Sequence, residues 1–300
     1  MAEPQLSATT RLENPRRYRG SLLGFFALTY VVTWTFFIAA VRLSERLPPG
    51  AGLGAGIQAL ILVGTFAPAM VALALTARAE GGAGVGALLS RLFQWQVGAR
   101  WYVFAAGYMA AIKLVVALVH RLATGAWPRF GHEPWVFMIG ATVLSTVVGG
   151  QAGEELGWRG YALPRLAARF GLGGASVVLG VIWACWHLPL FFLRGADTYG
   201  QSFPVYLLQV TALSVPIAWL YWRTNGSLLL TMLMHSAINN TKDIVPAVAR
   251  TPTNPLLPNA SLMSWLGIAV LWIAAVYFLV GMRKADPISR ERLDMPRHQL

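Results

Sequence analysis

The sequence is divided into apolar runs, most of them long enough to cross a lipid bilayer as a helix. A transmembrane helix needs about 20 mostly apolar residues, because the hydrocarbon core is about 30 Å thick and backbone polar groups must bond within the segment. Eight runs meet or approach this length: Ser21–Val41, Leu53–Thr76, Trp101–Val119, Trp135–Trp158, Leu172–Leu193, Ser202–Trp222, Ser227–Asn240 and Ser261–Met282. We therefore expect an all-α, polytopic membrane protein with about eight transmembrane helices.

Two further segments are too polar to span a bilayer but have the periodicity of a helix. In the segment 81–98, apolar residues recur at helical spacing opposite Arg91 and Gln94. The segment 161–170 carries Arg165 and Arg169 between apolar residues. We expect one or two interfacial amphipathic helices here.

The distribution of charge indicates a membrane protein without a soluble domain. The net charge is +12, but Lys and Arg form short clusters between the apolar runs, which favours a lipid bilayer over nucleic acid as the partner. The side that holds both termini carries 16 basic residues against 7 on the other side. We predict basic cytoplasmic tails at 1–20 and 283–300, and one membrane-embedded domain at 21–282. The Arg-rich, Ala- and Gly-rich composition is typical of a bacterium, so the expected location is the plasma (inner) membrane, with both termini cytoplasmic.

Two adjacent carboxylates, Glu154 and Glu155, end the fourth apolar run. Ionisable groups within a membrane segment are costly and usually have a partner. Glu155 and Arg159 are four residues apart, so they share one helix face in the favoured order of acid before base. Glu154 lies about 100° around the helix. It needs a different partner, which the sequence does not identify.

Two histidines lie well inside apolar runs and are candidates for the same polar site. His187 follows Trp183 by one turn and precedes Pro189, which is expected to end or kink its helix. His235 and Asn239 are four residues apart on one helix face. Counting along the runs places Glu154 near the cytoplasmic end of its span and His187 roughly 22 Å into its own, so depth alone does not bring them together.

The chemistry that fits Glu154, two histidines and an amide is attack of an activated water on a carbonyl group. A carboxylate and an imidazole can deprotonate water, while the second imidazole and the amide donate to the developing oxyanion. In the alternative, Glu154, His187 and His235 ligate a zinc ion that acidifies its bound water. The lone Cys185 excludes a Cys-based zinc site, and there is no HExxH motif.

Three motifs in order resemble those of the CPBP intramembrane proteases, a family that includes type II CAAX prenyl endopeptidases and bacteriocin-processing or immunity-related proteins. They are Glu154-Glu155-x-x-x-Arg159, Trp183-x-x-x-His187 and His235-x-x-x-Asn239, within a motif core of about 135–240. Trp183 departs from the family, which often has Phe there.

The resemblance implies an all-helical membrane peptidase with a cavity open to membrane and cytosol. Glu154 and His187 would activate the water, and His235 with Asn239 would stabilise the oxyanion. Glu155 and Arg159 would be structural. A metal, if the protein holds one, would lie between Glu154, His187 and His235.

We therefore predict a CAAX-protease-like intramembrane endopeptidase, glutamate-dependent or metal-dependent, that hydrolyses a peptide bond of a membrane-associated protein or peptide. The alternative is a non-catalytic immunity or scaffold protein that binds a partner through the same polar cavity. A proton-coupled transporter is a third hypothesis. It is disfavoured because the sequence has no internal repeat of the kind that builds many secondary transporters.

Overall fold

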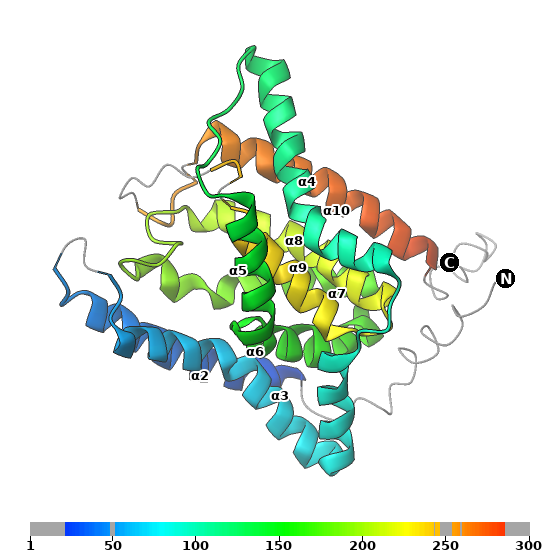
Figure 1. Ribbon diagram of the computed structural model, residues 1–300. Coiled ribbons are helices and arrows are strands. Elements are labelled where there is room, and N and C mark those ends of the chain that lie inside the picture. The colour runs from blue at the N-terminus through cyan, green and yellow to red at the C-terminus, as the bar shows by residue number, and fades with distance from the viewer. Residues whose placement is uncertain (1–21, 49–51, 243, 247–253, 259, 286–300) are drawn as a thin grey trace, which may run out of the picture.

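The protein is built from helices throughout the part of the chain that the computed structural model describes, residues 22–48, 52–242, 244–246, 254–258 and 260–285 (Figure 1). In chain order the elements are α2 (Leu22–Ser44), α3 (Ala55–Leu89), the 3₁₀ helix η2 (Ser90–Phe93), α4 (Ala99–Thr124), α5 (Trp135–Val148), α6 (Gln151–Glu155), the π-helical segment η3 (Leu156–Ala162), α7 (Leu163–Trp186), the 3₁₀ helix η4 (Leu188–Phe192), α8 (Phe203–Arg223), α9 (Leu228–Asn240) and α10 (Leu262–Ala285). The tail predicted at 1–20, and the C-terminal tail from 286 on, lie outside the described residues.

The expected all-α, polytopic architecture is confirmed. Six helical stretches of the described chain are long and apolar enough to cross a membrane, including α2, α4, α8 and most of α10. The apolar helix α5 is shorter, and α9 has only 13 residues. Each of the eight predicted spans thus corresponds to a helix. On α5, Val136, Val147 and Val148 are more than 65% exposed, as expected for side chains that face lipid.

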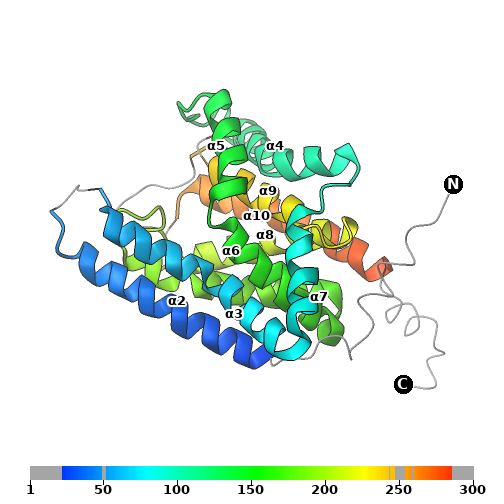
Figure 2. The same ribbon diagram turned by 60° about the horizontal axis from the view of Figure 1, so that its bottom comes forward.

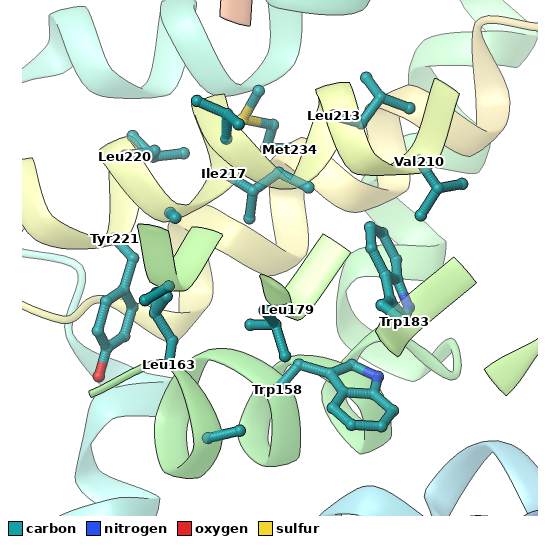
Figure 3. Packing of buried hydrophobic residues seen from close by; sticks show 14 of the residues in the cluster. Trp158, Leu163, Leu179, Trp183, Val210, Leu213, Ile217, Leu220, Tyr221 and Met234 are labelled. Carbon is teal, nitrogen blue, oxygen red and sulfur yellow. The ribbon is translucent and has the colours of Figure 1, made fainter. Parts of the chain in front are cut away.

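The helices surround a core made by α7, α8, α9 and η3. Helices α2 and α3 form an antiparallel pair on one side of the molecule, and α4 and α5 lie on the opposite side (Figures 1 and 2). Between them, Trp158 and Leu179 pack near Ile217 of α8 and Met234 of α9 (Figure 3). All four side chains are buried. This core fixes the relative positions of the helices that carry the polar motifs.

The expected fourth span is interrupted where it was predicted to be continuous. Helix α5 ends at Val148, and the backbone at Gly149 is extended (ψ 175°). The helix resumes at Gln151 and continues through the π-helical turns of η3 to Phe170. The segment 161–170 is therefore the continuation of the Glu154 helix and not a separate surface helix, because no break separates it from η3.

Two glycines with positive φ bend helices sharply. Gly81 (φ 66°) lies inside α3, so the helical segment that follows it turns away from the long first part of α3. This short segment and η2 occupy the predicted amphipathic region 81–98. Gly171 (φ 67°) lies inside α7 and reverses the chain. Left-handed backbone of this kind is accessible to Gly at little cost.

A glycine face joins the Glu154 helix to α3. A Cβ placed on Gly153 would lie 2.8 Å from Phe66 Cα, and one placed on Gly157 would lie 2.4 Å from Pro68 Cβ. Small residues permit such close approach of helices in membranes, where packing drives association. The position of Glu154 is therefore set by direct contact between this helix and α3.

Candidate active site

The reversal at Gly171 explains how Glu154 and His187 meet. They lie at nearly equal sequence distances on either side of this glycine, one before it and one after it. The helical segments before and after Gly171 run antiparallel and form a hairpin. Residues at equal sequence distances from Gly171 therefore lie side by side. Depth counting from separate spans failed because the arms form one hairpin within the 42-residue apolar stretch Gln151–Phe192.

Glu154 has a neutral hydrogen-bond partner, the indole of Trp183. Nε1 of Trp183 donates to Oε2 of Glu154 at 2.7 Å. Glu154 is only 7% exposed and lines a cavity of about 320 Å³ together with Gln58, Thr65 and Gln151. A donated hydrogen bond stabilises the carboxylate and fixes its orientation without neutralising its charge. One carboxyl oxygen of Glu154 is thus held by the indole, and the side chain borders the cavity.

Glu155 faces away from that cavity and is part of a buried ionic cluster. Its Oε1 accepts from Nη1 of Arg159 at 2.7 Å and is 2.9 Å from Nδ1 of His235. Glu155 and Arg159 are both fully buried, and His235 is 4% exposed. The ion pair between positions four residues apart is present, and it also ties α6 and η3 to α9.

The remaining face of the Arg159 guanidinium is covered by the ring of Trp183. Its Cζ lies 4.3 Å from the ring centroid, a cation–π distance. Nε and Nη2 of Arg159 have no hydrogen-bond partner among the described residues. The cation–π contact with Trp183 therefore stabilises the part of the guanidinium that has no hydrogen-bond acceptor nearby.

His187 is oriented by the backbone of the preceding turn. Its Nδ1 lies 2.8 Å from the carbonyl oxygen of Trp183, which can only accept, so Nδ1 carries the proton and Nε2 of the neutral ring is an acceptor. The ring packs edge-on against Trp186 and Tyr206, with centroids 4.6 and 5.5 Å away. The α-helix ends here, and Pro189 lies in the following 3₁₀ turn. The unprotonated nitrogen is thus suited to accept a proton from water.

Both histidines contact Trp183, which makes this residue the junction of the site. The ring centroids of His187 and His235 lie 5.8 and 5.2 Å from that of Trp183. His235 comes from α9 and His187 from the end of α7, so the indole spans the gap between them. The structure therefore places Glu154, His187 and His235 around one aromatic side chain.

Asn239 is not joined to this cluster by a hydrogen bond. It lies one turn beyond His235 on α9, is exposed, and makes no hydrogen bond to any described residue. The next residue, Asn240, instead donates from Nδ2 to Ser145 Oγ at 3.0 Å and so ties α9 to α5. No local pattern points to this second asparagine, because Ser145 is distant along the chain.

The donor atoms do not come together as a metal site. Among the described residues, no three His, Cys, Asp or Glu side chains lie close enough to hold a metal ion. The set Glu154, His187 and His235 therefore does not fit a zinc ion in this arrangement, and the mechanism below uses no metal.

Comparison with known proteins covers the part of the chain that contains these residues. Residues 133–241 match the sequence model of a family described as type II CAAX prenyl endopeptidase, Rce1-like. Residues 133–241, called the Rce1-like region below, are therefore similar to this family. The Rce1-like region runs from just before α5 to the end of α9, and so includes Glu154, His187 and His235.

A curated relative matches about a third of the chain. It is a protein named CAAX prenyl protease 2 from Methanococcus maripaludis, 32% identical over 98 residues. The match covers 31% of this chain and 36% of the relative, so the chain spans about a third of that relative's length. The similarity thus covers the helices of the polar cluster, while α2, α3 and α10 lie outside the Rce1-like region.

Sequence reasoning missed the partner of Glu154. The sequence places Trp183 one turn before His187 and indicates no contact with Glu154. Its N–H bond to Glu154 joins residues 29 positions apart and depends on the Gly171 reversal. No local pattern reports such a contact.

Proposed function

We propose that the protein is an intramembrane endopeptidase that hydrolyses a peptide bond of a membrane-associated protein or peptide. The observation that carries this proposal is Glu154, an ionisable group held by a neutral donor beside a cavity, with a histidine nitrogen available as acceptor in the same cluster. The Rce1-like match and the relative named CAAX prenyl protease 2 support the same reaction class. The name of that relative refers to a prenyl protease. The proposal for this chain concerns the peptide bond and does not include a prenyl group on the substrate.

In the proposed reaction, water is bound between the free oxygen of Glu154 and His187 Nε2. Glu154 and His187 together accept one proton of this water as the water oxygen attacks the scissile carbonyl. The same proton is then delivered to the leaving amine. Nδ1 of His235 donates to Glu155, so His235 stabilises the developing oxyanion by donating from Nε2 when both of its ring nitrogens carry a proton. Asn239 adds an amide donor at the exposed end of α9. Glu155 and Arg159 position His235 and do not contact the substrate.

The proposed location is the plasma membrane with both termini cytoplasmic. The count of basic residues over the whole sequence supports this orientation, because the side predicted to hold both termini carries 16 of them and the other side 7. Arg78, Arg91 and Arg100 lie toward the end of the molecule where α3 ends and α4 begins. Positive residues are enriched on the cytoplasmic side.

The decisive test is the change Glu154→Gln, which preserves size and can still accept from Trp183 but cannot take up a proton. Termini of membrane proteins would be compared by mass spectrometry in cells that carry the native chain or the variant. We expect new termini that depend on Glu154, with equal amounts of folded protein. Identical termini at equal abundance would contradict a protease and favour a binding protein.

Metal removal tests the mechanism separately. Because the three donor residues do not fit a zinc site in this arrangement, we expect dialysis of the purified protein against a zinc chelator to leave peptidase activity unchanged. Loss of activity that added zinc restores, together with zinc in the purified protein by elemental analysis, would show that the side chains rearrange around a metal.

A further inference from the structure

A second and larger cavity lies near the turn of the hairpin, away from Glu154. Its volume is about 790 Å³, and it is enclosed by the end of α3, η2, the junction of η3 with α7, and the turn between α8 and α9. Glu154, His187 and His235 are not among its lining residues. The proposed reaction therefore leaves this cavity unexplained.

The lining of this cavity is amphipathic. One part is apolar and includes Leu88, Leu163 and Leu172, while another part offers polar side chains such as Gln94 and Asn225. A ligand that satisfies both parts has an apolar body and a polar head. Phe93, Trp95 and Trp222 lie in or beside the same segments, in keeping with the aromatic residues that collect where a membrane meets water.

The charged residues of the lining favour an anionic head. Arg91 and Arg165 line the cavity with a single acid, Glu80. Arg91 donates to the hydroxyl of Tyr221, and Arg165 donates to the carbonyl of Tyr161 at 3.0 Å. Arg165 also bonds Glu80 at 3.3 Å. Both guanidinium groups are thus held in place, and the lining has a net positive charge.

A buried hydroxyl on the wall has no partner. Tyr161 lines the cavity and is fully buried, and its hydroxyl makes no hydrogen bond to any described residue. Leaving a buried hydroxyl unsatisfied costs on the order of 1–3 kcal/mol. The hydroxyl has less than 1 Å² of accessible surface, so an acceptor oxygen of a ligand would reach it, and remove this cost, when the Tyr161 ring shifts toward the cavity. The guanidinium of Arg165 lies over the same ring, with Cζ 3.5 Å from its centroid.

We propose that this cavity binds the phosphate group of an anionic phospholipid. Arg side chains recognise phosphate oxygens through paired N–H bonds, and a tyrosine hydroxyl can donate to a further oxygen. The apolar wall would hold the glycerol backbone and the first part of an acyl chain. The bend at Gly81, which folds the segment of Leu88 back toward α7, encloses this wall.

The experiment uses the full chain, purified in a neutral detergent and stripped of lipid. Thermal unfolding would be followed with added phosphatidylglycerol, phosphatidylcholine or inorganic phosphate. A ligand that binds only the folded state raises the unfolding midpoint, and at one concentration a tighter ligand raises it more. We expect a clear rise with phosphatidylglycerol and little with phosphatidylcholine. An equal rise of the midpoint with inorganic phosphate would show that the cavity binds phosphate, but it would reject a phospholipid as the ligand.

Two variants and a control test whether phosphatidylglycerol binds in this cavity. Tyr161→Phe removes only the unpartnered hydroxyl, so the lipid-free protein should be no less stable, yet phosphatidylglycerol should bind about tenfold more weakly. Arg91→Gln should weaken binding at least as much. Arg78→Gln, an exposed arginine on α3 that does not line the cavity, should leave binding unchanged.

The proposal would be overturned if phosphatidylglycerol and phosphatidylcholine stabilised the native chain equally. It would also be overturned if Tyr161→Phe and Arg91→Gln kept the full native response. Retained phosphatidylglycerol would be counted independently by native mass spectrometry for the same four proteins. Neither readout depends on peptidase activity.

Discussion

At the scale of single residues, Trp183 contacts Glu154, Arg159 and both histidines of the candidate site. Its indole N–H bonds Glu154, its carbonyl holds His187, and its ring covers the guanidinium of Arg159 and packs against His235. The two carboxylates of the Glu-Glu pair thus lie in different environments. Glu155 is paired with Arg159 and His235, whereas Glu154 accepts a hydrogen bond from a neutral indole.

Trp183→Phe tests this positioning role. Phenylalanine retains an aromatic ring but cannot donate to Glu154. A hydrogen bond to a charged group is worth about 1.5–3 kcal/mol, so we expect kcat to fall about tenfold or more while KM changes little. Trp34→Phe, which removes the indole bond to the carbonyl of Trp186, is the matched control and should leave kcat near native. An unchanged kcat in Trp183→Phe would show that the bond has no role in turnover.

Glu155 and Arg159 are expected to act on stability. Their side chains are fully buried, and removing one member of such a pair leaves an uncompensated charge at a cost of about 3–5 kcal/mol. Glu155→Ala and Arg159→Ala should each lower the unfolding midpoint strongly, and the double variant should cost less than the two single costs added together.

The control pair is Arg42 and Glu45, whose side chains are 74% and 47% exposed. Arg42→Ala should cost less than about 1 kcal/mol. If Glu155→Ala and Arg159→Ala were instead well folded but inactive, the pair would have a direct part in catalysis.

At the scale of elements, the site depends on two contacts that bring helices unusually close. The glycine face of α6 and η3 lies directly on α3 at Phe66 and Pro68. The reversal at Gly171 brings α7 back along the same helix. Together these contacts set the distance from Glu154 both to the wall of its cavity and to Trp183.

Gly157→Ala should therefore destabilise the protein, because the added methyl group would lie 2.4 Å from Pro68 Cβ. Overpacking of this kind costs about 1–3 kcal/mol. Gly140→Ala on α5 is the matched control, because nothing lies within 4 Å of its added Cβ. There, alanine should be neutral or stabilising by up to about 1 kcal/mol. Equal unfolding midpoints for the two variants would contradict the close contact.

The sequence predicted the helices well and their breaks poorly. Apolar length located the helices, because a bilayer imposes such a length on a spanning segment, and six helical stretches of the described chain are long and apolar enough to cross a membrane. It did not reveal that Gly149 interrupts the fourth span or that the helix continues through η3 to Phe170. Gly is common in membrane helices and often stays helical, so Gly149, Gly153 and Gly171 could not be distinguished from the sequence.

The sequence predicted some contacts of the candidate site and missed others. The spacing of Glu155 and Arg159 predicted an ion pair, and the apolar surroundings of His187 and His235 singled them out. The bond from Trp183 to Glu154 and the bond from Asn240 to Ser145 were not predicted, because each joins distant segments. Asn239 was expected beside His235, but the structure leaves it exposed and without a hydrogen bond to any described residue.

At the scale of the whole molecule, the two cavities lie at different levels of one hairpin. The Glu154 cavity is bounded by the first turns of α3, from Gln58 to Thr65. The larger cavity is bounded by the last turns of the same helix, from Thr76 to Leu88. The candidate active site is thus nearer the end of the molecule where α3 begins, and the basic cavity is at the opposite end. Orientation in the membrane decides which cavity faces the cytoplasm.

Labelling at the two ends of α4 would determine that orientation. In a Cys185→Ala background, a single cysteine would be placed either at Gln96, before α4, or at Ala126, after it; both positions are exposed. The end that holds Arg78, Arg91 and Arg100 should be cytoplasmic. A membrane-impermeant maleimide should therefore label Ala126→Cys in intact cells, and Gln96→Cys only after permeabilisation. The reverse pattern would place the basic cavity outside the cell and the beginning of α3, with the Glu154 cavity beside it, toward the cytoplasm.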